Sequence, residues 1–276
     1  MKDVSVIGAG RFGLFWGRQL SHHVQVTMWD KNPDLQSDVE HFASWDNLTE
    51  CLSKEIIFLT VPIRHIEAFL TRYKKDFVSG SVIVDCSSVK LVVENWFERI
   101  LADDINWMAT HPLFGPDSAE LSVRGKNLAI TSARVDRVQL DEILFLFQQK
   151  LGLQILNMDA DEHDRLMAYN LSLMHHVGRA LHRLGVTELE LQMAHIKRIC
   201  QTIKTVMNDN VSLFEDFNRF NPYSKAVKQD FLTCFQEVDD RVIQAEDHRI
   251  SNEDRIKSAL EVPMFHGTEL TLNHKI

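Results

Sequence analysis

The chain has 276 residues, of which 45% are hydrophobic and 25% charged, and its formal net charge at pH 7 is −9. This composition is ordinary for a globular protein that holds one large domain or two moderate ones and can bury a core. The acidic balance, with a pI near 5.8, argues against a nucleic-acid-binding surface. No apolar run reaches the length of a membrane span, so no membrane partner is expected.

The cysteines and histidines predict no metal site. The four cysteines are widely spaced and form no C-x-x-C pair: Cys51, Cys86, Cys200 and Cys234. This spacing predicts neither a disulfide framework nor a zinc site, and no i, i+4 pair of histidines suggests another metal. The first residues enter a strand-like run directly, without the features of a signal peptide. Together these features predict a protein of the reducing cytoplasm.

A glycine motif at residues 8–13 follows a short apolar run at 4–7 and precedes a helix-like stretch at 12–20. In such a motif Gly8 permits a tight turn, Gly10 lets the backbone approach a pyrophosphate, and Gly13 lets helix pack on strand. The helix N-terminus adds free N–H groups and partial positive charge. The context predicts a dinucleotide site that includes Arg11 and Phe12, with a ligand-free glycine turn as the minor alternative.

Two further strand ends extend this predicted cofactor site. A second apolar run at 24–29 ends at Asp30, about 20 residues past the glycines, where an acidic side chain binds the adenosine ribose hydroxyls. Asp30 would repel a 2′-phosphate, so NAD is expected rather than NADP. A third run at 56–61 is closed by a proline, and its last residues, Val61 and Pro62, are expected to line the same site.

The remaining pattern predicts an α/β fold in two parts. Strand-like runs at 81–85, 107–111, 128–131 and 154–156 alternate with helices at 64–73 and 136–151, which predicts a Rossmann-type, mostly parallel sheet with helices on both faces over residues 1–157. Over residues 158–276 strand-like runs vanish, which predicts an all-α domain. Helices are expected from about 159 to 184, at 188–208, 213–220, 224–245 and 252–260, before an irregular tail at 262–276.

The first of these later helices carries the clearest pattern. Asp159 or Asp161 is placed to cap it. Its predicted buried stripe recurs at near-helical spacing and consists of Leu166, Tyr169, Leu173, Val177 and Leu181.

His111 is the first candidate for chemistry. It ends the strand at 107–111 and precedes a rigid Pro/Gly turn at 112–116. Ligands bind at the carboxyl ends of strands in open parallel sheets, so a neutral imidazole here can accept a proton from a substrate beside a nicotinamide. A purely structural role at the strand end is equally open. Ser87 and Ser88 follow the neighbouring strand; either could orient the imidazole, although spacing alone favours helix capping.

Four segments resemble the prephenate/arogenate dehydrogenase family in their order and spacing: residues 8–13, 88–90, the His-Pro-Leu-Phe-Gly-Pro run at 111–116 and the His-Asp-Arg run at 163–165. The resemblance implies a Rossmann domain followed by an all-α dimerisation domain. It implies NAD-dependent oxidative decarboxylation of prephenate to 4-hydroxyphenylpyruvate, or of arogenate to tyrosine. It further implies that His111 accepts the hydrogen bond and the proton of the substrate hydroxyl, and that Ser88 orients His111.

In the helical part the resemblance implies that His175, twelve residues after His163, lines the substrate site. His163 itself is expected at the domain junction. Because His175 and His176 are consecutive on a helix, only one of them is expected to face inward.

One departure concerns the substrate carboxylates. Members of the family usually bind them with an arginine on a later helix, and the aligned register here holds Lys197 and Thr205, with Arg198 and Lys204 one position away. Lys197 and Arg198 are therefore the expected carboxylate ligands. The departure leaves open a same-fold dehydrogenase acting on a related cyclohexadienyl substrate in a secondary pathway, or a non-catalytic nucleotide-sensing protein.

Two expectations concern assembly. A homodimer is expected because the helical part concentrates five phenylalanines, which either fill its own core or form a shared interface: Phe214, Phe217, Phe220, Phe231 and Phe235. The chain is expected to hold neither a fused chorismate mutase before the glycine motif nor a folded regulatory domain after the helices.

Overall fold

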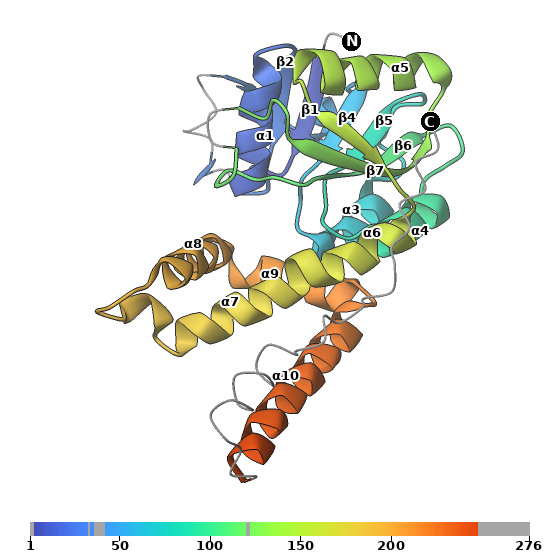
Figure 1. The fold of residues 1–276 in the computed structure, drawn as a ribbon. Helices are drawn as coiled ribbons and strands as arrows, with labels where there is room; N and C mark the ends of the chain where they lie inside the picture. The colour runs from blue at the N-terminus through green and yellow to red at the C-terminus, as the bar shows by residue number, and fades with distance from the viewer. Residues whose placement is uncertain (1–2, 33, 36–41, 120–121, 248–276) are drawn as a thin grey trace. The chain divides into compact units, whose positions relative to one another are not determined.

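The computed structural model describes residues 3–32, 34–35, 42–119 and 122–247. Its contacts divide the chain into two compact units, residues 1–228 and 229–276. The first unit contains one eight-stranded sheet with the order β3-β2-β1-β4-β5-β6-β7-β8 (Figure 1). The strands are β1 (Asp3–Ile7), β2 (Gln25–Trp29), β3 (Ser44–Trp45), β4 (Ile56–Leu59), β5 (Val82–Asp85), β6 (Asn106–Pro112), β7 (Asn127–Arg134) and β8 (Gln154–Asn157).

The sheet confirms the predicted α/β fold. All neighbouring strands pair in parallel except β6 and β7, which are antiparallel. The antiparallel pair follows from the chain itself, because β7 returns after the loop beyond His111 without a crossover helix. The strand order from β3 to β6 is that of a dinucleotide-binding fold, with β1 and β4 at the point where the order reverses.

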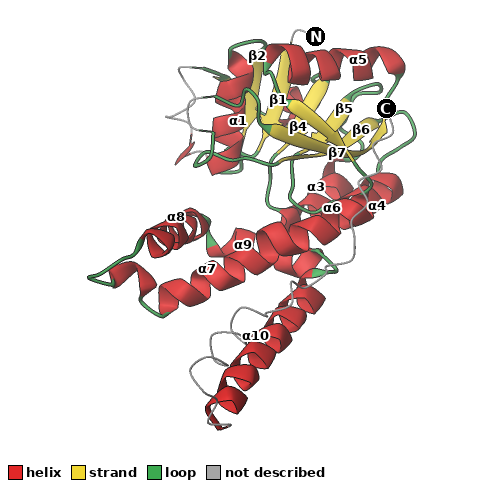
Figure 2. Cartoon of the chain, viewed as in Figure 1, coloured by secondary structure: helices red, strands yellow, loops and turns green. Residues whose placement is uncertain are grey.

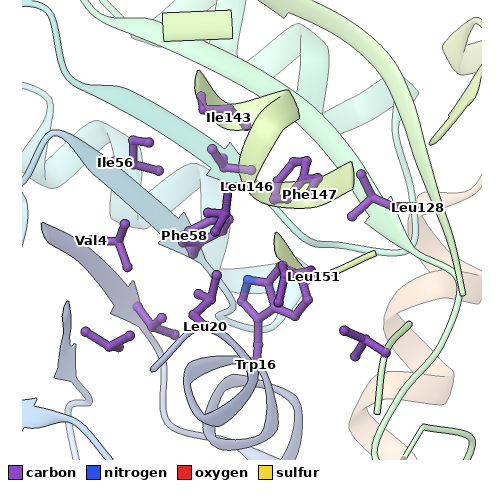
Figure 3. Close-up of a cluster of buried hydrophobic side chains, with 14 of the residues drawn as sticks. Val4, Trp16, Leu20, Ile56, Phe58, Leu128, Ile143, Leu146, Phe147 and Leu151 are labelled. Carbon is purple, nitrogen blue, oxygen red and sulfur yellow. The ribbon is translucent and has the colours of Figure 1, made fainter. Parts of the chain in front are cut away.

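Helices cover both faces of the sheet. One face packs against α1 (Arg11–Ser21), α5 (Arg137–Phe145) and the π-helical turn η2 (Leu146–Lys150), and the other against α2 (Leu48–Leu52), α3 (Ile63–Tyr73) and α4 (Leu91–Ile100). Alternation along β1 sends Val4 and Val6 to the first face and Ile7 to the second. Figure 3 shows the first core, where the Trp16 ring lies 5.8 Å from that of Phe58 and 6.3 Å from that of Phe147.

After β8 every described element is a helix (Figure 2). These helices are α6 (Ala160–Met167), the π-helical turn η3 (Ala168–Leu173), α7 (Met174–Arg183), the 3₁₀ turn η4 (Val186–Glu188), α8 (Ala194–Asn208), α9 (Val211–Phe220) and α10 (Ser224–Asp247). The change from sheet to helices thus falls after Asn157. A domain division there remains a prediction, because the contacts place residues 158–228 in the same compact unit as the sheet. The helix expected at 252–260 and the tail at 262–276 lie outside the described residues.

The buried face of α6, η3 and α7 differs from the predicted apolar stripe. Tyr169 is 55% exposed, and the residues that are buried are Ala160, His163, Asp164, Met167, Ala168, Ser172, His175 and Gly178. The π-helical turn widens the backbone and shifts the face, so a 3.6-residue period does not continue through it. Asp159 rather than Asp161 caps α6, because its carboxylate accepts from the Glu162 N–H at 2.8 Å.

Two helices also differ from the sequence prediction. Helix α8 begins at Ala194 rather than at residue 188, and α2 has no counterpart among the helices predicted from the sequence. Helix α4 is the helix implied by the predicted capping at Ser87 and Ser88. Within the described part of the chain, no helix combines the length and the apolar character needed to cross a membrane.

Candidate active site

The glycine loop between β1 and α1 has the geometry of a phosphate cradle. Gly8 has φ of +105°, which favours glycine, and a Cβ on Gly13 would lie 1.8 Å from the Gly8 carbonyl oxygen. A Cβ on Gly10 would meet no protein atom within 4 Å. Gly10 is also the N-cap of α1, and no side chain caps that helix end. The protein therefore needs glycine at positions 8 and 13 for its own packing, whereas at Gly10 it leaves open space beside free N–H groups that suit a pyrophosphate.

Asp30 lies at the carboxyl end of β2 and makes a hydrogen bond to this loop. One carboxylate oxygen accepts from the Ala9 N–H at 2.7 Å, and the other accepts from the Asn32 N–H at 2.8 Å. Thr60, at the end of β4, donates its hydroxyl to the Gly8 carbonyl oxygen at 2.8 Å. These contacts fix the loop, and the remaining lone pairs of Asp30 can accept from ribose hydroxyls as predicted.

The other predicted cofactor residues lie in different environments. The Phe12 ring is half-buried and packs beside Trp16, at 6.0 Å between centroids, while its backbone belongs to the glycine loop. Val61 is half-buried and Pro62 is exposed at the N-cap of α3. The Arg11 guanidinium points away from the loop's own backbone: it donates to both Asp117 carboxylate oxygens, at 2.9 and 3.0 Å.

Arg11 ties together three segments that are distant in sequence. It also donates to the Asn208 carbonyl oxygen at 3.0 Å and lies 3.7 Å from the Asp209 carboxylate. Asp117 belongs to the loop that follows β6, and Asn208 and Asp209 end α8. The glycine loop, the loop after His111 and the end of α8 therefore meet at one place.

His111 lies in a hydrogen-bonded chain with two residues of α6. Its Nδ1 is 2.9 Å from Nε2 of His163, and Nδ1 of His163 is 2.8 Å from the Asp164 carboxylate. His163 and Asp164 are fully buried. Burial lowers the pKa of His111 well below 6.5, and the neighbouring His163 and Lys90 lower it further. Burial likewise lowers the pKa of His163, so both imidazoles are neutral near pH 7.

These hydrogen bonds determine which ring nitrogen carries the proton in each histidine. Ionised Asp164 only accepts, so Nδ1 of His163 donates to it and Nε2 of the neutral ring is an acceptor. Nδ1 of His111 must then carry the proton that it donates to His163, which leaves Nε2 of His111 with a free lone pair. His111 is thereby prepared as a hydrogen-bond acceptor.

The Asp164 carboxylate also caps the N-terminus of helix α4. Asp164 accepts from the backbone N–H groups of Lys90 and Leu91, at 2.8 and 3.0 Å. Neither serine caps this helix, contrary to the reading favoured by spacing: the Ser87 hydroxyl donates to the Val89 carbonyl oxygen at 3.0 Å. The Ser88 hydroxyl is buried without a hydrogen-bond partner among the described residues.

His163 is therefore part of the site, although it was expected only at the domain junction. The role of orienting His111 had been expected of Ser88. The side chain that contacts His111 is His163, from a helix 52 residues further along the chain. The His-Asp pair at the start of the helical part was the available signal. An unpartnered buried hydroxyl leaves Ser88 free to contact a bound ligand, and its predicted role remains a prediction.

His175 is buried on α7, while His176 is half-buried and donates to the Ser172 carbonyl oxygen at 2.8 Å. His175 stacks on the Phe214 ring at 6.2 Å, and its Nε2 lies 3.4 Å from the Asp209 carboxylate. Burial lowers the pKa of His175 to about 4, with help from nearby Arg179. Because Asp209 also contacts Arg11, His175 joins the place where the three segments meet.

Lys197 and Arg198 do not join this group. Both are exposed in the first turns of α8, and neither side chain makes a hydrogen bond or ion pair within the described residues. Lys197 precedes Asp209 by twelve residues, which is about 18 Å along a helix. Among the described residues, no group of three or more His, Cys, Asp or Glu could hold a metal ion.

Comparisons with known proteins find similarity to one family. The family model described as "Prephenate dehydrogenase, nucleotide-binding domain" matches residues 18–152. Arogenate dehydrogenase 1, chloroplastic, of Arabidopsis thaliana is 24% identical over 249 residues, which cover 85% of this chain and 38% of that protein. A probable arogenate/prephenate dehydrogenase of Methanocaldococcus jannaschii is 24% identical over 257 residues, covering 87% of this chain and 56% of that protein. The chain therefore matches this family's model over its nucleotide-binding part, and along most of its length it is similar to arogenate and prephenate dehydrogenases.

The chain spans less than two thirds of the length of either of these relatives. Among solved structures, prephenate dehydrogenase from Aquifex aeolicus has a TM-score of 0.72 at 17% identity, covering 95% of this chain and 98% of that one. The same enzyme in complex with hydroxyphenyl propionate and NAD+ has a TM-score of 0.68 at 16% identity, covering 94% and 96%. At these identities the likeness shows that the fold is shared.

Proposed function

We propose that the chain catalyses the NAD-dependent oxidative decarboxylation of prephenate to 4-hydroxyphenylpyruvate, or of arogenate to tyrosine. The similarity to prephenate and arogenate dehydrogenases supports the reaction, and the open glycine loop with Asp30 at the end of β2 supports the cofactor. The observation that carries the proposal is the Asp164–His163–His111 chain, which leaves Nε2 of His111 as an acceptor. NAD bound at the loop supplies the hydride acceptor.

The residues of the chain perform the rest of the step. Nε2 of His111 accepts the hydrogen bond of the ring hydroxyl and takes its proton as the carbon–oxygen bond becomes a carbonyl. The proton on Nδ1 of His111 stays directed at His163, and Asp164 stabilises the charge that His111 gains through the intervening imidazole. The ring carboxylate leaves as CO₂, and the electron pair of the broken bond enters the ring. The carbonyl oxygen then takes up a proton and becomes the phenol hydroxyl, and formation of the aromatic ring drives the reaction.

The charges beside His175 bear on the choice between the two substrates. Prephenate and arogenate differ in a keto group against an ammonium group on the side chain. Asp209 places a carboxylate 3.4 Å from His175, and a carboxylate attracts an ammonium group. The relatives in Arabidopsis thaliana also carry the name arogenate dehydrogenase. We therefore expect catalytic efficiency with arogenate to equal or exceed that with prephenate.

The test is NAD reduction by the purified protein, followed at 340 nm with prephenate and with arogenate. The His111→Asn variant is expected to lose about 10²–10⁴-fold in turnover while it binds NAD as the wild type does. Near-wild-type turnover of this variant at saturating substrate would remove His111 from the mechanism. Absence of reduction by the wild type with either substrate would favour the alternative substrate or the nucleotide-sensing reading.

We also propose that the protein is a homodimer in a reducing compartment such as the cytoplasm. The four cysteines are free. Phe217 is buried and Phe214 and Phe220 pack against the core of their own unit. On α10, by contrast, a stripe with spacings of 4, 3 and 4 residues is exposed: Phe231, Phe235, Val238 and Val242. This spacing suits helix–helix packing, and light scattering at micromolar concentration is expected to give about twice the monomer mass.

A further inference from the structure

The substrates proposed above are anions, so the site needs a cation that no other side chain neutralises. Two guanidinium groups lie against the end of α8, beside His175. That of Arg11 is already paired with both Asp117 oxygens. That of Arg179 reaches only backbone carbonyl oxygens, of Asp209 at 2.9 Å and Val206 at 3.4 Å. Within the described residues Arg179 forms no ion pair with a carboxylate.

The position of Arg179 fits a ligand-binding group. It is half-buried on α7, one helical turn after His175, so the two side chains share a face. Its guanidinium carbon lies 4.8 Å from the centre of the Phe214 ring, on which His175 also stacks. This aromatic contact holds the guanidinium in place.

Two polar atoms beside this ring lack partners. Nε of Arg179 and Nδ1 of His175 are both buried and make no hydrogen bond within the described residues. Such orphaned donors and acceptors are costly unless a ligand or water satisfies them. A carboxylate that accepted from Nε of Arg179 would satisfy the arginine and balance its charge.

We propose that Arg179 binds the side-chain carboxylate of the substrate, an inference that rests on the proposed function. The side-chain carboxylate keeps its charge throughout the reaction. The ring carboxylate loses its charge on leaving as CO₂, so a guanidinium bound to it would stabilise the ground state more than the transition state. Arg179 on α7 thus takes the role that the sequence assigned to Lys197 or Arg198 on α8.

The competing interpretation is that Arg179 only caps the C-terminal carbonyls of α8, as basic side chains do at helix ends. The variant Arg179→Gln separates the two. A binding role predicts a Michaelis constant raised about tenfold to a hundredfold, the worth of a charged hydrogen bond, with turnover nearly unchanged. It also predicts weaker binding of hydroxyphenyl propionate, which keeps the side-chain carboxylate and lacks the ring carboxylate, to the NAD-loaded protein in titration calorimetry.

Arg183→Gln is the matched control, because Arg183 is an exposed arginine one turn further along α7, and it is expected to keep wild-type values. Arg179→Lys retains the charge, and an intermediate Michaelis constant supports the proposal even if Arg179→Gln folds poorly. A lowered melting temperature of Arg179→Gln with unchanged Michaelis and dissociation constants overturns it in favour of capping. Wild-type Michaelis and dissociation constants in both Arg179 variants would also overturn the proposal. If the wild type itself reduces no NAD with either substrate, the proposed function fails, whereas unchanged hydroxyphenyl propionate binding counts against Arg179 alone.

Discussion

Alanine at Gly10 is expected to separate NAD binding from folding, because this glycine is the one in the motif that the protein's own packing leaves free. A Cβ there meets nothing within 4 Å. Its φ of −67° and ψ of −178° are accessible to any residue. Gly10→Ala should therefore change the free energy of unfolding by no more than about 1 kcal/mol, the range of an N-cap change.

The added methyl group would instead fill the space in which a pyrophosphate approaches the loop. Loss of one hydrogen bond from a backbone N–H to a charged phosphate costs about 1.5–3 kcal/mol. The dissociation constant for NAD should rise by about tenfold to 150-fold. Titration calorimetry measures the dissociation constant, and thermal unfolding followed by circular dichroism measures the stability.

Gly13→Ala is the control variant, because it is expected to lower the stability of the protein itself. Its Cβ would lie 1.8 Å from the Gly8 carbonyl oxygen, where real Cβ contacts are essentially never under 3.0 Å. Helix α1 must shift away from the loop, at a cost of about 3 kcal/mol or more, which is a fall of roughly 6–12 °C in melting temperature for a chain of this size. A wild-type dissociation constant for NAD in Gly10→Ala would refute the assignment of the pyrophosphate to this loop.

Four further outcomes follow from the same structure. Asp30→Ser with Asn32→Arg should shift the ratio of catalytic efficiencies toward NADP, since it removes a repelling carboxylate and adds a phosphate partner; an unchanged ratio would mean that the ribose lies elsewhere. Catalytic efficiency should stay flat from pH 8 to 6, because burial lowers the pKa of His111 well below 6.5; a midpoint near 6.5 would contradict a buried base. Burial lowers the pKa of His175 to about 4, so the unfolded chain binds more protons below about 6.5 and the melting temperature should fall between pH 7 and 5; a rise would reverse the sign. Asp164→Asn should lower the free energy of unfolding in urea by about 1–3 kcal/mol, since it leaves a backbone N–H at the start of α4 without an acceptor; equal stability would show that water replaces it.

The sheet and the glycine loop could be predicted because their signals are local. A buried parallel strand is a short apolar run, and the loop after β1 needs glycine at fixed offsets for steric reasons that any reader of the sequence can apply. The antiparallel return of β7 left no such signal, because pairing direction depends on how the intervening chain folds back.

The site could be predicted only in part. His111 stands out by its place at a strand end. Its contact with His163 joins residues 52 positions apart and depends on how α6 packs, which no local pattern encodes. Arg179 was missed for a related reason: a lone arginine on a helix looks like a solvated residue until a neighbouring ring and helix end show what surrounds it.

Because of the π-helical turn η3, helical periodicity predicted the wrong buried face in this part of the chain. This segment inserts a wide turn between His163 and His175, and a strict 3.6-residue stripe therefore selected Tyr169, which is exposed. The buried face of these helices is polar because His163 of α6 meets His111 at a strand end, and His175 of α7 meets Asp209 at the end of α8. An apolar pattern could not have found it, whereas a search for clustered polar residues at helical spacing could.

Asp164 links the chemistry of His111 to the assembly of the fold. With one carboxylate it accepts the first N–H groups of α4 and the Nδ1 proton of His163. His163 and Asp164 both belong to α6, so the docking of α6 against the start of α4 brings this pair to His111. If that docking loosened, Nδ1 of His111 would lose His163 as its acceptor, and either ring nitrogen of His111 could then carry the proton. A base prepared in this way is active only in the assembled molecule, and its activity reports on that assembly.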